Sequence, residues 1–197
     1  MDPSLSPHSI ANANSILGLG LGDAGVLGVS TLLVDSVDYA DNPGLGGITP
    51  SVANIPFTPE AEDPRFAVRY SGYLNVTSDD TYVFSVLHDD GFQLSLGGEL
   101  VSVFDGDTGP IVTLTAPLAL SAGLYPISLL GWEQGGVFIN ELGWSKGSAG
   151  AFTVPDSSVL FSRAGVAPVP EPGTWVAMGS LAALMGGAWM RRRGQSA

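Results

Sequence analysis

The chain has 197 residues, no cysteine, and a formal net charge of −12 from 19 acidic and 7 basic residues. Such an acidic surface is a poor partner for nucleic acid, whose phosphates attract basic proteins. The length suits one domain that buries a core without disulfides, so stability must come from packing or bound ions. Glycine, at 27 residues, favours strands and turns over helices.

The first 64 residues carry only weak structural signals. Residues 1–15 are polar, and we expect them to be disordered. The stretch that follows is rich in glycine and proline; within it, Thr31–Asp35 is a candidate strand and Asn42–Asn54 is typical of a loop.

The start of the chain does not look like a secretory signal peptide. Met1-Asp2-Pro3-Ser4 has no lysine or arginine, and the apolar segment Ile16–Val34 is interrupted by Asp23 and by five glycines. We therefore interpret the start as missing or misassigned.

From Arg65 onward the hydrophobic pattern changes to period two, which indicates half-buried β-strands. Phe66, Val68 and Tyr70, for example, alternate with Ala67 and Arg69. Turn-forming residues separate further runs of this kind, at Tyr82–Leu87, Phe92–Leu96, Leu100–Phe104, Val112–Leu120, Leu124–Trp132 and Val137–Trp144. Short strands at this spacing predict an all-β sandwich or barrel over residues 16–148, followed by a Gly/Ser/Pro-rich linker over 149–172.

Five motifs occur in order between residues 60 and 145. They are Gly72-Tyr73-Leu74, Tyr82-Val83-Phe84-Ser85, Asp89-Asp90-Gly91, Gly123-Leu124-Tyr125-Pro126-Ile127 and Trp132-Glu133-Gln134-Gly135-Gly136. This order resembles the protective-antigen-type (PA-fourteen) family, which occurs in toxins, glycosidases and GLEYA- or flocculin-like yeast adhesins. The resemblance implies an antiparallel, lectin-like β-sandwich in which one group of loops binds carbohydrate.

The Asp89-Asp90 pair is the centre of the site that this resemblance implies. In the sugar-binding relatives, two adjacent aspartates are joined by a cis peptide and hold a calcium ion that grips sugar hydroxyls. Calcium takes six to eight oxygen ligands. The implied metal ligands are Asp89, Asp90, Glu133 and Gln134, the last two standing where adhesins often use asparagine, and the implied sugar contacts are Asp89, Asp90 and Trp132. The alternative is a plain Asp-Asp-Gly turn without an ion.

Other polar and aromatic residues are weaker candidates. We expect His88 to be a partly exposed residue at a strand end. Asp105-Gly106-Asp107 is either a second calcium-type loop or a solvated turn, and Trp132 either packs in the core or rim or stacks on a sugar. No serine lies in a nucleophile elbow and there is no cysteine nucleophile, so we expect no enzyme activity.

The tail over residues 169–194 combines three signals. Pro170-Glu171-Pro172 is followed by an uncharged apolar run over residues 174–190 and then by Arg191-Arg192-Arg193. A helix of about 17–25 apolar residues spans a bilayer, and arginines beside it stay cytoplasmic. The alternative to a processed signal is an ordinary membrane anchor that is never cleaved.

This order resembles the PEP-CTERM sorting signal of Gram-negative bacteria. The resemblance implies export, anchoring in the inner membrane through one C-terminal transmembrane-type helix, and recognition by an exosortase-type protease or transpeptidase. The mature protein would reach the cell surface or extracellular matrix. The sequence thus predicts a calcium-dependent binding protein for exopolysaccharide in a biofilm, or alternatively a structural envelope protein whose sandwich binds no ligand.

Overall fold

The computed structural model describes residues 5–41, 47, 53–55, 65–147 and 150–162, which all lie in one compact unit, Met1–Ala164. The predicted sorting signal, with Pro170, Glu171, Pro172, the apolar run 174–190 and Arg191–Arg193, lies outside the described residues. Among the residues that are described, no helix is long and apolar enough to cross a membrane. The sorting signal therefore stays a prediction.

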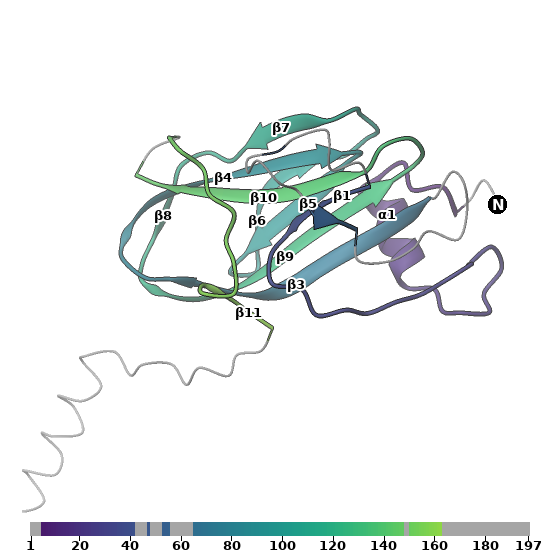
Figure 1. Ribbon diagram of the computed structural model, residues 1–197, viewed down its shortest axis with the longest axis horizontal. Helices are drawn as coiled ribbons and strands as arrows, with labels where there is room; N and C mark the ends of the chain where they lie inside the picture. Colours follow the sequence, from purple (N-terminus) through teal and green to yellow (C-terminus); the bar gives the residue numbers. More distant parts are fainter. Residues whose placement is uncertain (1–4, 42–46, 48–52, 56–64, 148–149, 163–197) are drawn as a thin grey trace, which may run out of the picture. The chain divides into compact units, whose positions relative to one another are not determined.

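Two β-sheets pack face to face (Figure 1). The first has the strand order β2-β1-β10-β4-β7, with β8 also paired to β4, and the second has the order β11-β3-β9-β5-β6. Neighbouring strands are antiparallel except for the parallel pair β1 and β2. The strands are β1 (Asp38–Ala40), β2 (Ala53–Asn54), β3 (Phe66–Val76), β4 (Asp80–Asp89), β5 (Phe92–Leu96), β6 (Glu99–Phe104), β7 (Ile111–Leu114), β8 (Leu118–Leu120), β9 (Gly123–Glu133), β10 (Ile139–Lys146) and β11 (Leu160–Phe161).

The core lies between the two sheets and follows the alternation predicted from the sequence. In β5, for example, Phe92, Leu94 and Leu96 are buried whereas Gln93 and Ser95 are only partly covered. The inward residues of β3, β4 and β9 join them in one apolar cluster. The predicted β-sandwich is confirmed in its two facing, mostly antiparallel sheets. It was predictable because a shift of one residue would turn the buried face of a strand outward, so period-two burial fixes the register.

The N-terminal segment differs from its prediction, because residues 10–15, expected to be disordered, belong to helix α1 (Ile10–Leu17). Ser9 caps the helix by accepting a hydrogen bond from the Asn12 amide at 3.2 Å. Ala13 is fully buried against Leu130 and Trp132. This burial on a distant strand stabilises a helix too short to form alone, and a local reading of the sequence does not reveal it.

Two predicted strand assignments are also corrected. Thr31–Asp35 forms no strand, and the chain first pairs three residues later, in β1. The run Val112–Leu120 is divided into β7 and β8, which both pair with β4. The division falls where the Thr115 hydroxyl accepts a hydrogen bond from the Phe84 amide at 2.9 Å, and Pro117 then has no N–H to continue the ladder.

Parts of the predicted loop and linker belong to the sandwich. Ala53–Asn54, at the end of the predicted loop, forms β2. Within the predicted linker, Thr153 bridges to Trp144, and β11 pairs with β3 at Leu74 and Tyr73. The sandwich therefore extends to Phe161 and not only to residue 148.

Candidate functional site: a buried acidic cluster

Asp89 and Asp90 lie at the end of β4, where the chain turns into β5. Both residues are only 5% exposed, and the peptide bond between them is cis. Gly91 follows because no side chain fits there: a Cβ atom would lie 2.1 Å from the Trp132 ring and 2.7 Å from the Gly106 carbonyl oxygen. The turn is thus pressed against β9 and against the loop after β6.

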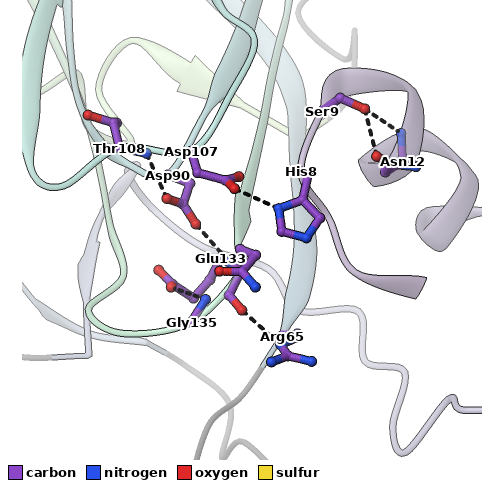
Figure 2. A network of polar contacts seen from close by, with 10 residues as sticks. His8, Ser9, Asn12, Arg65, Asp90, Asp107, Thr108, Glu133 and Gly135 are labelled. Carbon is purple, nitrogen blue, oxygen red and sulfur yellow. Dashed lines mark hydrogen bonds and ion pairs between the residues drawn. The ribbon is translucent and has the colours of Figure 1, made fainter. Parts of the chain in front are cut away.

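Backbone amides from two other loops hold the Asp90 carboxylate. Its Oδ1 accepts a hydrogen bond from the Thr108 amide and its Oδ2 from the Gln134 amide, each at 2.8 Å (Figure 2). The Asp90 amide in turn donates to the Trp132 carbonyl at 2.9 Å. Asp90 therefore ties together the ends of β4 and β9 and the loop that precedes β7.

Glu133, at the end of β9, brings a third carboxylate to the same place. Its side chain is fully buried, and its Oε1 accepts a hydrogen bond from the Gly135 amide at 2.7 Å. Its Oε2 is buried and has no hydrogen-bond partner. One oxygen each from Asp89, Asp90 and Glu133 lie within 4.8 Å of one another. Such a set of hard oxygens fits a calcium ion.

Asp41 is a fourth acidic residue beside this cluster, and it is not among the residues predicted from the sequence. It follows β1, whose Ala40 is in register with Ile139 of β10, which in turn is opposite Asp89. Its Oδ1 is buried without a hydrogen-bond partner. The only sequence signal is an acidic residue after a three-residue strand, so its place in the cluster follows from strand pairing alone.

Burial and mutual repulsion raise the pKa values of the cluster. Burial, followed by the negative charges of Asp90 and Asp41, raises the pKa of Asp89 to about 7. Burial raises the pKa of Glu133 to about 8, with further contributions from Asp90, Asp89 and Asp41. Burial also raises the pKa of Asp90, although the two amide hydrogen bonds oppose that shift. A divalent cation would compensate the repulsion between these carboxylates, which contributes to their raised pKa values.

His88 contacts the backbone of the Asp89-Asp90 turn. The prediction that it is partly exposed is wrong. It is fully buried, and its ring lies 4.5 Å from Phe92 and 5.2 Å from Phe104 between centroids. Its Nδ1 lies 2.5 Å from the Asp90 carbonyl oxygen, which can only accept, so Nδ1 carries the proton. Nε2 then accepts from the Thr113 hydroxyl at 2.9 Å, and burial lowers the pKa of the ring.

The other two predicted site residues, Gln134 and Trp132, contact the cluster through their backbones. Gln134 contributes its backbone: its amide holds Asp90, and its carbonyl accepts a hydrogen bond from Arg65 at 2.9 Å. Trp132 is fully buried beneath α1, against Ala13, so its ring offers no face to a sugar. The burial of Trp132 contradicts the predicted carbohydrate contact and matches the core-packing alternative.

The Asp105-Gly106-Asp107 loop anchors the N-terminal segment. Asp105 accepts a hydrogen bond from the Ile10 amide at 2.7 Å, and Asp107 pairs with His8 at 2.6 Å (Figure 2). These carboxylates do not belong to the group of potential metal ligands found among the described residues. Both aspartates are exposed, as the solvated-turn alternative predicts, and the loop in addition holds the N-terminal segment.

The fold and the site together define a β-sandwich domain with an acidic cluster at one end. The PA14 domain family matches residues 51–158, more than half of the chain. The chain therefore belongs to the PA14 domain family, which confirms the resemblance found in the sequence. No curated protein matches the chain.

Two solved structures with TM-scores above 0.5 show the same fold. A PA14 sugar-binding domain from an RTX adhesin has a TM-score of 0.56 at 19% identity, over 79% of this chain and 88% of that chain. An anti-sigma factor domain-containing protein has a TM-score of 0.51 at 22% identity, over 66% of this chain and 42% of that chain. The PA14 domain of the MpAFP antifreeze protein has a TM-score of 0.46 at 27% identity, and this chain covers about half of it, 51%.

Proposed function

We propose that this PA14 domain is a calcium-dependent carbohydrate-binding module of an exported surface protein. The observation that carries the proposal is the buried carboxylate group of Asp89, Asp90 and Glu133, with the Glu133 Oε2 atom left without a hydrogen-bond partner. Buried charges of one sign need a compensating ion or must take up protons. Asp41 adds a further buried oxygen beside the group.

The carbohydrate part of the proposal draws on the adhesin domain of the same fold, which is described as sugar-binding. A calcium ion held by a few protein oxygens keeps coordination positions that sugar hydroxyls can fill. A polysaccharide with neighbouring hydroxyls, such as an extracellular matrix polymer, suits this mode of binding. Trp132 plays no direct part, because α1 covers it.

A calcium titration of the full-length chain tests the ion site. We expect calorimetry to show saturable calcium binding, with a melting temperature that rises with calcium concentration, because an ion bound only to the folded state stabilises it. The variant Asp89→Asn/Glu133→Gln should lose both effects. Asp105→Asn is the matched control, since Asp105 is an aspartate outside the cluster, and it should bind calcium like the wild type.

The two functional alternatives separate in the same experiment. A structural sandwich that binds no ligand would show no calcium effect in the wild type, and that result would overturn the proposal. If calcium binds, a glycan array probed with and without EDTA identifies the sugar. Glycan binding that persists in EDTA would remove calcium from the mechanism but not carbohydrate binding.

We further propose that the C-terminal signal sorts the protein through an exosortase-type system. The proposal rests on the order of Pro170-Glu171-Pro172, the apolar run 174–190 and Arg191–Arg193 in the sequence. The chain would be held in the inner membrane before processing and released to the surface or matrix afterwards. Deleting Arg191–Arg193 and fractionating the cells tests this, and unchanged processing and location would argue against it.

A further inference from the structure

An apolar groove of about 880 Å³ lies along β3, and none of the carboxylates of the acidic cluster lines it. One wall is the extended segment Val26–Val34, which we call the strap, and the other is Arg65 together with β3 over residues 66–73. Core residues of the facing sheets, among them Leu129 and Leu142, form the floor. Figure 1 shows the strap as the dark segment that leaves α1, passes along β3 and rises to β1. The volume is within the range of small-molecule sites, about 300–1,000 Å³.

The strap exposes several large apolar side chains to solvent. Leu27, Val29, Leu32 and Leu33 are 58%, 61%, 52% and 80% exposed. No residue between Val26 and Val34 is charged, and none pairs with a strand among the described residues. A cluster of large apolar side chains in contact with water usually marks a binding surface.

The strap lies between two anchored elements. On one side α1 packs on Leu130 and Trp132 through Ala13, and a local turn follows, in which the Val26 amide donates to the Asp23 carbonyl at 3.1 Å. At the other end Val37 is buried in the core, and its carbonyl accepts a hydrogen bond from the Leu142 amide at 2.9 Å. A segment held at its ends and unpaired between them can move aside to admit a ligand without unfolding the domain.

Arg65 and Arg69 give the groove a positive charge, and Arg65 already donates to the Gln134 carbonyl. Arg69 lies on β3 and donates to the Asn14 side chain of α1. Within the described part of the chain, no carboxylate forms an ion pair with it. A guanidinium carries five N–H donors in a fork that matches a carboxylate. In a chain with a net charge of −12, a cation without an acidic partner beside an apolar groove favours an anionic head group.

We propose that this groove binds a single-chain amphiphile, a long-chain fatty acid, with its hydrocarbon between the strap and β3 and its carboxylate at Arg69. The apolar lining supplies the affinity and Arg69 orients the chain. Affinity should therefore rise about fourfold for each methylene that enters the groove, until the groove is filled. Binding in this groove should not require calcium, because Asp89, Asp90 and Glu133 do not line it.

Photolabelling of the full-length chain in detergent-free buffer tests the proposal. A palmitate analogue with a diazirine near its methyl end is added and activated, and the labelled peptides are identified by mass spectrometry. We expect label in residues 26–34 and 65–73, which excess palmitate removes and acetate does not. Octanoate should compete much less well than palmitate.

Variants of Arg69 and Leu33 test which residues contribute to palmitate binding. Arg69→Gln should weaken palmitate competition about fivefold, the effect of one exposed ion pair, whereas Arg69→Lys should restore most of it. Leu33→Asp puts a negative charge on the strap at a position 80% exposed, so it should reduce labelling without changing the melting temperature. Lys146→Gln is the control, because Lys146 pairs with Asp80 at 3.5 Å and does not line the groove.

Three results would overturn the proposal. Label confined to residues 174–190 would mean that the probe binds the apolar run of the tail. Label that appears only when phospholipid vesicles are present would make the groove a membrane contact. Equal competition by palmitate in wild type and in both Arg69→Gln and Leu33→Asp would show that neither the charge nor the strap contributes to binding.

Discussion

The acidic cluster and the strap groove reverse the usual distribution of residues in opposite ways. At the cluster, carboxylates that normally face water are buried, with Glu133 fully inaccessible. Along the strap, leucines and valines that normally lie inside are exposed, with Leu33 at 80%. Each reversal costs stability in the free protein, and each would be relieved by a ligand of matching chemistry: a cation in one case, a hydrocarbon chain in the other.

The two regions also differ in the hydrogen bonds that hold them in place. Backbone amides of Thr108 and Gln134 fix the Asp90 carboxylate, and the buried His88 ring holds the Asp90 carbonyl. The strap has no comparable network between its ends. A preorganised site suits a small ion whose geometry is strict, whereas a loosely held wall suits ligands of variable length.

The largest expected effect is the response of the cluster to pH without calcium. The pKa of Asp89 is raised from 3.8 to about 7 and that of Glu133 from 4.5 to about 8, so the folded state binds more protons than the unfolded state in this window. Stability should be greatest below about pH 4 for these groups and fall by several kcal/mol as the pH rises to 8.

Calcium should cancel that loss, because the ion replaces the protons. Urea unfolding at pH 5 and pH 8, with EDTA and with calcium, measures both effects. If the free energy of unfolding in EDTA is the same at the two pH values, then the pKa values of Asp89 and Glu133 are not raised.

Asp90→Ala should have the next largest effect. It removes the acceptor of two backbone hydrogen bonds and leaves the Thr108 and Gln134 amides unpaired. We expect a loss of about 3 kcal/mol in EDTA at pH 5, together with loss of calcium binding. Asp107→Ala, which changes an exposed pair with His8, should cost less than about 1 kcal/mol. Similar costs for the two variants would contradict the assignment of Asp90 as the link between the loops.

Gly91→Ala should cost about 2 kcal/mol or more, because its Cβ would collide with the buried Trp132 ring. Gly109→Ala is a matched control, since nothing lies within 4 Å of the Cβ it would add. Chemical unfolding of both variants measures the difference. If the two variants are equally stable, then the turn is able to move away from β9, and the cluster is less rigid than its contacts imply.

The smallest effect is expected on the strap, where Leu33→Ser should change the free energy of unfolding by less than about 0.5 kcal/mol. Leu129→Ala, at a position only 1% exposed on the floor of the groove, should cost about 2–5 kcal/mol. The comparison is made by urea unfolding without any ligand. A large cost for Leu33→Ser would mean that the strap is an integral part of the core and not a movable wall.

Local sequence patterns were sufficient wherever a residue's place depends on its neighbours along the chain. The alternation of Phe92, Leu94 and Leu96 predicted a strand with one buried face, and the strand is observed. The turn at Asp89-Asp90-Gly91 was located from its residue types, and the resemblance to a family brought Glu133 to the same site.

Tertiary structure decided what depends on distant contacts. Helix α1 exists because Ala13 packs on Leu130 and Trp132, more than a hundred residues away, and the same contact removes Trp132 from solvent. Asp41 joins the cluster only through the pairing of β1 with β10. The sequence patterns thus determined the main strands between residues 66 and 146 and the turn at Asp89-Asp90-Gly91, and the family resemblance added Glu133. Only the packed sandwich decided which side chains meet and which are covered, because these contacts leave no periodic signal along the chain.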